Sequence, residues 1–190
     1  GSTIAGAEFG LYAKEDIKAG EKVIVKADEQ LCTAVTGDDG TAVFEQDLPF
    51  GSYYIKELQA PDGFVSSDEI IEVTVSYQGQ DVEVVRLKEI FKNQPTTVEF
   101  RKSDLTTGVE LDGATLTVLD KDGNEIDKWT SVKGEPHIIK RLHVGETYIL
   151  REEFAPYGYL KAEEVEFTIT DTAEIQNCLL YTSDAADEAR

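Results

Sequence analysis

The chain has 190 residues, of which 41% are hydrophobic and 29% charged, a composition typical of a folded protein rather than a disordered tail. It carries 18 Lys and Arg against 38 Asp and Glu, a net charge of −20 that argues against binding to nucleic acid or to an anionic membrane surface. No apolar run approaches the roughly 20 residues of a bilayer span, so direct membrane insertion is not expected. The chain contains no Met, which indicates a fragment or a processed protein.

Short runs rich in β-branched and aromatic residues follow one another along the chain, separated by turn signals such as 37–40 and 61–63. This pattern predicts an all-β fold of the sandwich type, similar to an immunoglobulin domain. One stretch, 13–23, could hold a helical turn. The clearest expected strands are 73–75, 82–87, 98–100, 116–118, 148–150 and 165–169.

Two segments of the first half recur in the second half. The segment GSYYIKELQAPDGF at 51–64 returns as GETYILREEFAPYGY at 145–159, with equivalent residues 95 positions apart from Tyr53 and Tyr148 onward. The segment GAEFGLYAKEDI, which begins at Gly6, returns as GATLTVLDKDG from Gly113, so an insertion or deletion separates the homologous strands. Self-similarity of this kind predicts two tandem copies of one β-sandwich module.

The polar connector 93–97 contains Pro95, which cannot lie inside a central strand, so we place the module boundary there. The expected domains are 1–94 and 95–177, followed by an atypical tail at 178–190. The composition of this tail resembles a peptide translated from outside the natural gene. The alternative is a genuine C-terminal strand at 178–182 with a frayed end, and both interpretations remain open.

Side-chain parity points several polar residues inward. Residues two apart in a strand share a face, so Lys102 shares a face with two apolar neighbours of its strand. By the same rule Glu57 and Glu152 each share a face with a Tyr and an aliphatic residue, and Asn93 has the parity of apolar residues that end the first module. The other interpretation of this parity is a Lys or Glu at a strand edge that extends to solvent.

Burial of such groups has a chemical consequence. It lowers the pKa of a lysine and raises that of a glutamate, which favours the neutral amine and the neutral acid. A neutral amine is a nucleophile, and a protonated carboxyl beside an Asn or Asp side chain can polarise its carbonyl and transfer protons. These groups could therefore form an amide bond between strands, once and without turnover.

The elements TTGVELDGATLTVLDKDGNEIDKW, YILREEFAPYGY, GAEFGLY and YYIKELQAPDGF resemble the SpaA-like, prealbumin-type domains of Gram-positive pilins and adhesins, relatives of the collagen-adhesin B-type repeats. The resemblance extends to about Asn177. In that family a Lys on the first strand bonds to an Asn or Asp on the last strand, with the Glu of a Y-x-x-x-E element as catalyst. The resemblance implies Glu57 and Glu152 as isopeptide-promoting residues, and Lys102 and Asn93 as cross-link candidates.

The sequence departs from the family pattern in both modules. The first module begins after the place of its Lys strand, and the last strand of the second module runs into the tail, where Asp184 is the only nearby acid. We therefore expect no completed cross-link in either module.

The resemblance implies spacer or stalk modules of an adhesin or pilin-like protein, located outside the cell on the bacterial wall, with neighbouring modules of the same protein as partners. The alternative is a module that recognises a host matrix protein or glycan. No cofactor and no enzyme activity beyond one isopeptide-forming event is expected.

Metal sites are not expected either. The segment 120–124 resembles the opening of a calcium loop but lacks a glycine at the sixth place and an acid at the twelfth, so a hairpin turn is favoured. His137 and His143 have no neighbouring Cys, which argues against zinc.

Overall fold

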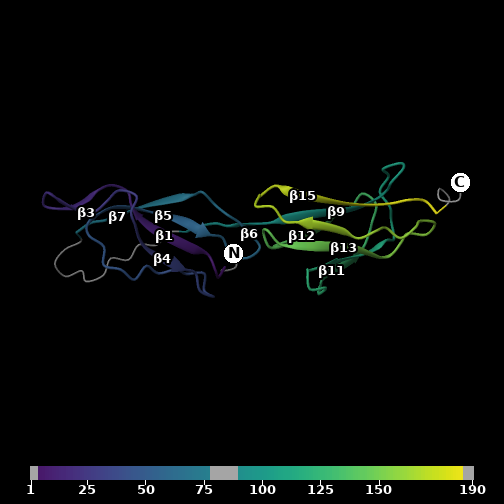
Figure 1. Ribbon diagram of the computed structural model, residues 1–190, viewed down its shortest axis with the longest axis horizontal. Helices are drawn as coiled ribbons and strands as arrows, with labels where there is room; N and C mark the ends of the chain where they lie inside the picture. Colours follow the sequence, from purple (N-terminus) through teal and green to yellow (C-terminus); the bar gives the residue numbers. More distant parts are fainter. Residues whose placement is uncertain (1–3, 78–89, 186–190) are drawn as a thin grey trace. The chain divides into compact units, whose positions relative to one another are not determined.

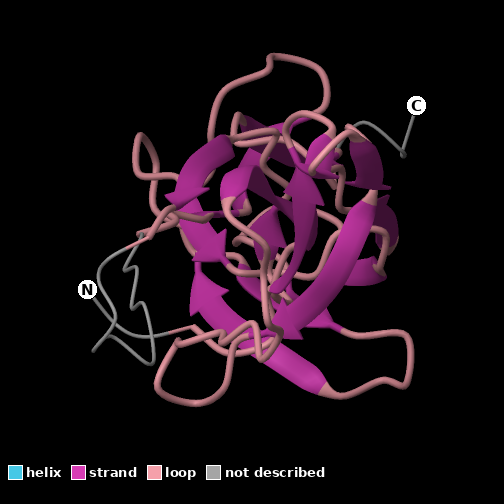
Figure 2. Ribbon diagram, turned by 90° about the vertical axis from the view of Figure 1, so that its left-hand side faces the viewer, coloured by secondary structure: helices cyan, strands magenta, loops and turns pink. Residues whose placement is uncertain are grey.

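The structure, a computed structural model, describes residues 4–77 and 90–185. Regular structure within these ranges is entirely β, which confirms the predicted class (Figures 1 and 2). The segment 13–23 holds no helical turn, because it forms most of a small hairpin, and the expected strand 82–87 lies outside the described residues. The strands are β1 Glu8–Ala13, β2 Ile17–Ala19, β3 Lys22–Val25, β4 Gln30–Val35, β5 Gly51–Gln59, β6 Phe64–Val65, β7 Ile70–Val75, β8 Gln94–Pro95, β9 Thr97–Asp104, β10 Thr115–Leu119, β11 Glu125–Thr130, β12 His137–Lys140, β13 Thr147–Phe154, β14 Val165–Thr168 and β15 Ile175–Thr182.

The chain divides into two compact units. Unit 1 comprises Gly1–Pro61 and Ser66–Asn93, and unit 2 comprises Asp62–Val65 and Gln94–Arg190. In the part of the chain that the structure describes, no helix is long and apolar enough to cross a membrane.

Unit 2 is a β-sandwich. A four-stranded sheet in the order β11-β10-β13-β14 faces a three-stranded sheet in the order β12-β9-β15. Large apolar side chains from both sheets, including Phe100, Leu116, Leu150 and Leu180, are almost fully buried between them. Strands β9 and β15 run parallel, in register along the whole length of both. The first and last long strands of the unit are therefore hydrogen-bonded neighbours.

Unit 1 repeats the four-stranded sheet of unit 2. Its order is β4-β1-β5-β7, with β2 and β3 as a separate hairpin. Its core is built around Leu11 and Tyr53. The pairing also repeats, since Glu57 on β5 lies opposite Phe9 on β1 and Glu152 on β13 lies opposite Leu116 on β10. The internal repeat is thus a repeat of strand pairing as well as of sequence.

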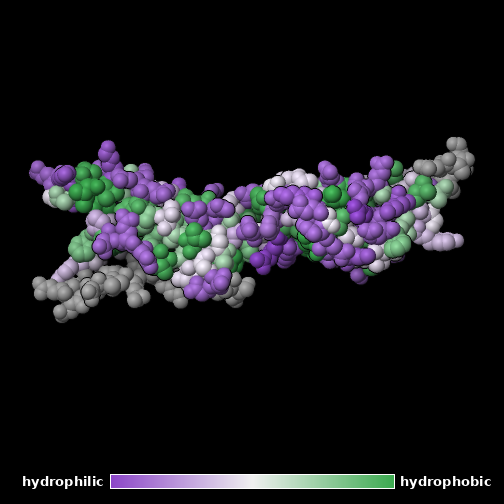
Figure 3. Space-filling view, turned by 60° about the horizontal axis from the view of Figure 1, so that its bottom comes forward, coloured by the Kyte–Doolittle hydropathy of each residue, from purple (hydrophilic) through white to green (hydrophobic). Residues whose placement is uncertain are grey.

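Polar side chains dominate the face of the molecule drawn in Figure 3, with hydrophobic residues in small groups between them. This distribution agrees with a net charge of −20, because most acidic side chains must remain in water. The buried apolar residues form one core in each unit.

The connector between the repeats is ordered by pairing. Strand β8 pairs antiparallel with β6, so Pro95 lies in a two-stranded ladder and not in a central strand. Next to this ladder, the N–H of Thr96 donates to the carbonyl of Gly63 over 3.1 Å, and the N–H of Arg141 donates to the carbonyl of Thr96 over 3.0 Å. Gly63 has φ +81°, and a Cβ there would lie 2.9 Å from the carbonyl carbon of Arg141. Only glycine fits this approach.

Replacing Gly63 with Ala should therefore destabilise unit 2 by clearly more than the roughly 1–2 kcal/mol that a left-handed backbone costs an alanine. Gly158, its counterpart in the second repeat, is a matched control, because its φ is +87° but nothing lies within 4 Å of an added Cβ. Urea denaturation of G63A and G158A compares the two losses. Equal losses of unfolding free energy in the two variants would show that the close packing of Gly63 against Arg141 does not stabilise the unit.

Candidate functional site

Lys102 is buried inside unit 2 because of the alternation of β9. Val98, Phe100 and Lys102 alternate with more exposed residues and point into the core. The side chain of Lys102 has no exposed surface. The inward parity predicted from the sequence is confirmed, and the alternative of a strand-edge lysine that reaches solvent is wrong.

Glu152 reaches the same point from the opposite sheet. It follows Tyr148 and Leu150 on the inward face of β13, and its side chain is also fully buried. Its Oε1 lies 3.2 Å from the Nζ of Lys102, and its Oε2 accepts a hydrogen bond from the N–H of Ala162 over 2.5 Å. An amine and a carboxyl thus meet in the centre of an apolar core.

Few other polar groups contact the amine of Lys102 and the carboxyl of Glu152. Among the described residues, neither the Nζ of Lys102 nor the Oε1 of Glu152 has a hydrogen-bond partner beyond this contact. Burial lowers the pKa of Lys102, and the attraction of Glu152 offsets this only in part. The environment therefore favours the neutral amine, the form that can act as a nucleophile.

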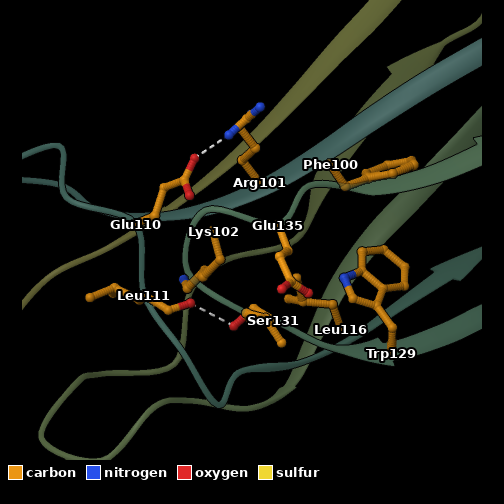
Figure 4. A pocket seen from close by; sticks show the side chains of 10 residues that line it. Phe100, Arg101, Lys102, Glu110, Leu111, Leu116, Trp129, Ser131 and Glu135 are labelled. Atoms are coloured by element: carbon orange, nitrogen blue, oxygen red, sulfur yellow. Dashed lines mark hydrogen bonds and ion pairs between the residues drawn. The ribbon is translucent and has the colours of Figure 1, made fainter.

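A cavity of about 10 Å³ adjoins Lys102, and Figure 4 shows the side chains around it. Two interactions hold its wall together. Arg101 forms an ion pair with Glu110, and the hydroxyl of Ser131 donates to the carbonyl of Leu111 over 2.8 Å. The N–H of Leu111 in turn donates to the carbonyl of Lys102 over 2.9 Å. The loop after β9 is thereby fixed beside the amine.

Unit 1 brings together Glu57 and Asn93, the two candidate residues that the sequence assigns to the first module. The Nδ2 of Asn93 donates to the Oε1 of Glu57 over 2.6 Å, and the N–H of Ser67 donates to its Oε2 over 3.0 Å. Glu57 is only half-buried, which corrects the expectation of a largely buried side chain. In unit 2 strand β9 covers Glu152, but among the described residues of unit 1 no strand takes the corresponding place.

The two units therefore differ in the group that faces the equivalent carboxyl. Unit 2 has the carboxyl with an amine, and unit 1 has the carboxyl with a carboxamide. Asp184, the acid considered as a possible partner of Lys102, is exposed and lies opposite Tyr159 in an isolated bridge, whereas Lys102 is fully enclosed.

The remaining motifs are structural. Asp120 accepts hydrogen bonds from the N–H groups of Asp122 and Asn124, as expected of a hairpin turn. His137 bonds to Asp127 through Nε2 over 2.8 Å and stacks on Trp129. The described ranges contain no group of three or more side chains that could hold a metal ion.

Replacing Lys102 with Met should lower the free energy of unfolding of unit 2 by roughly 3–5 kcal/mol, because the carboxyl of Glu152 stays buried without its partner. The double variant K102M/E152Q should recover much of this loss, since a carboxamide is neutral and can still accept the N–H of Ala162. The control is K121M, which removes an ion pair with Glu146 whose side chains are 66% and 44% exposed and should cost less than about 0.5 kcal/mol. Equal losses in K102M and K121M, measured by urea denaturation, would contradict the buried pair.

The lowered pKa of Lys102 also predicts a pH dependence. Between the folded-state pKa and the ordinary lysine value of 10.5, the unfolded chain binds more protons at this residue than the folded chain. The free energy of unfolding should therefore gain a positive contribution as the pH rises toward 10.5. Urea denaturation of the wild type and K102M at several pH values isolates this contribution as a difference in slope. A wild-type slope no steeper than that of K102M would show that burial does not perturb the amine.

Comparison with known proteins places the chain in a family. The model of the SpaA prealbumin-like fold domain matches residues 1–89 and again residues 96–178. No curated protein matches the chain.

Several solved structures are similar in fold. The TIE protein of Bacillus anthracis matches with a TM-score of 0.57 and 24% identity over 96% of this chain, which spans only 31% of that protein's chain. The shaft pilin SpaA of Lactobacillus rhamnosus GG matches with a TM-score of 0.43 and 17% identity, over 96% of this chain and 88% of that one. The minor pilin of Streptococcus agalactiae matches with a TM-score of 0.42 and 17% identity, over 97% and 85% of the two chains. By its two family matches, the chain belongs to the SpaA prealbumin-like fold domain family.

Proposed function

We propose that the two units are spacer modules in the stalk of a bacterial cell-surface adhesin or pilin-like protein, of the type that isopeptide bonds between Lys and Asn or Asp stabilise. Membership of the SpaA family supports this assignment, and so does the tandem arrangement of two similar modules. The partners would be neighbouring modules of the same protein, outside the cell and on its wall. The acidic surface would keep such an array soluble and extended.

The observation that carries the proposal is the buried contact between Lys102 and Glu152. A spacer of this type needs an amine held neutral next to a carboxyl that can transfer a proton. In the reaction, the Nζ of a lysine attacks the Cγ of an asparagine, the bond from Cγ to the amide nitrogen breaks, and ammonia leaves with the transferred proton. Unit 2 holds the amine and the carboxyl of this reaction 3.2 Å apart.

The strand order of unit 2 also suits a spacer. Tension that enters through the start of β9 and leaves through the end of β15 pulls two parallel neighbours in opposite directions along their length. All of their hydrogen bonds are then sheared together instead of opening one after another.

The alternative, a module that binds a host matrix protein or glycan, would rely on an exposed aromatic surface. The stack of Trp129 on His137, with ring centroids 4.1 Å apart, is one feature of unit 2 that could serve it, and Phe154, Tyr157 and Tyr181 are exposed aromatic side chains of the same unit. However, Trp129 also packs against Phe100 in the core, with ring centroids 5.2 Å apart. This use of the ring in the core argues against Trp129 as the centre of a binding surface.

A force measurement on unit 2 tests the proposal. Handles at position 97 and at the exposed position 181 shear β9 against β15, whereas handles at 97 and 140, which are opposite each other in the antiparallel β9–β12 pair, unzip that pair. We expect a severalfold higher unfolding force in the first geometry. Similar forces in both geometries would remove the mechanical argument for a spacer.

A further inference from the structure

We propose that position 182 is the acyl-donor position of unit 2, and that Thr182, which occupies it, is the residue that keeps Lys102 a free amine. The inference rests on the proposed function, because it assumes that the Lys102–Glu152 pair is part of an amide-forming site. The family resemblance implies only that the third member of that site lies on the last strand, and the structure supplies its position.

Backbone hydrogen bonds align the last strands of the two repeats. The N–H of Thr96 donates to the carbonyl of Gly63 over 3.1 Å, and the N–H of Ala185 donates to the carbonyl of Gly158 over 3.0 Å. The two glycines are equivalent by the offset of 95 between the repeats, so Thr96 and Ala185 are equivalent as well, with an offset of 89.

Strand pairing gives the same alignment. Phe64 lies opposite Pro95, and its equivalent Tyr159 lies opposite Asp184. The offset of 89 therefore holds at two neighbouring positions of the chain. Counting back from either of them, the counterpart of Asn93 is Thr182.

The carboxyl groups are anchored alike in the two units. One oxygen of Glu57 accepts the N–H of Ser67, and one oxygen of Glu152 accepts the N–H of Ala162, which is the equivalent of Ser67. The other oxygen faces the amide of Asn93 in unit 1 and the amine of Lys102 in unit 2. Superposed, the two units describe one site in which amine, carboxyl and carboxamide meet.

Thr182 has the placement that this site requires. It is 4% exposed and shares the inward face of β15 with Leu180, which lies directly opposite Lys102 on the neighbouring strand. It is thus the next inward position beyond the amine, within the range of a long side chain. Its hydroxyl, which donates to the carbonyl of Leu160, offers the amine no carbonyl carbon.

The acids nearby do not take this role. Asp104, a buried carboxyl on β9, accepts hydrogen bonds from the N–H groups of Thr106 and Thr107 in the turn that follows the strand. Asp184 corresponds to Pro95 and is exposed. The presence of Thr182 therefore explains why Lys102 has no side-chain carbonyl carbon to attack.

The variant T182N tests the inference. The Nζ of Lys102 should attack the new side-chain Cγ, the bond to the amide nitrogen should break, and ammonia should leave, with Glu152 transferring the proton. Intact mass should fall by about 17 Da below the sequence mass of the variant, whereas the wild-type protein should show its full sequence mass. A tryptic peptide joining Lys102 to position 182 would locate the bond, and the melting temperature should rise by more than about 10 °C.

Three controls separate the chemistry from folding. T182N/K102R removes the nucleophile, T182N/E152Q removes the proton carrier, and T182V keeps the shape of Thr182 without a carboxamide, so none should lose mass. T182D, which would expel water and lose about 18 Da, is the second route if T182N folds poorly.

Full sequence mass in both T182N and T182D, whether the unit folds or not, would overturn the inference, as would a mass deficit in the wild type. The force measurement on the unchanged chain does not involve position 182. Failure of this inference can therefore be told apart from failure of the spacer role.

Discussion

The centre of unit 2 is defined by one buried contact between unlike groups, the amine of Lys102 and the carboxyl of Glu152. Removing an amine and a carboxyl from water costs more than their attraction returns unless geometry and further hydrogen bonds are favourable. In unit 2 the carboxyl gains only the N–H of Ala162, and the amine gains nothing further among the described residues. A pair of apolar residues would stabilise the same core at least as well, so the stability of the fold does not account for the pair. Its chemistry does.

The internal repeat supplies information that a single module could not. Unit 2 shows where an amine lies relative to the carboxyl, and unit 1 shows where a carboxamide lies relative to the equivalent carboxyl. Because Ser67 and Ala162 hold these carboxyls in the same way, the two partial sites can be combined without a third structure. The two units then differ in one respect: the equivalent carboxyl faces the amine of Lys102 in unit 2 and the carboxamide of Asn93 in unit 1.

Much of this arrangement could be predicted from the sequence. The alternation of β9 and β13 is regular, so parity alone places Lys102 and Glu152 inward, and both are buried. Parity fails for the extent of burial of Glu57, because burial depends on which strand covers a face and not on the face itself. The role proposed for Thr182 could not be predicted, because the offset between repeats changes from 95 to 89 before the last strand and only backbone hydrogen bonds and strand pairing reveal the change. The hairpin within 13–23 could not be told from a helical turn, because short hairpins leave almost no periodic signal.

In the proposed spacer, the position of the site within the sandwich matches the path of tension. Parallel β9 and β15 resist extension by shear, but hydrogen bonds break and re-form, so this resistance is temporary. A covalent bond between Lys102 and position 182 would carry tension directly from the first strand to the last and leave the residues between them unloaded. The residue that transfers the proton must then belong to neither β9 nor β15, because it has to reach the side chains at positions 102 and 182 from across the core. Glu152, on the central strand β13 of the opposite sheet, has that position.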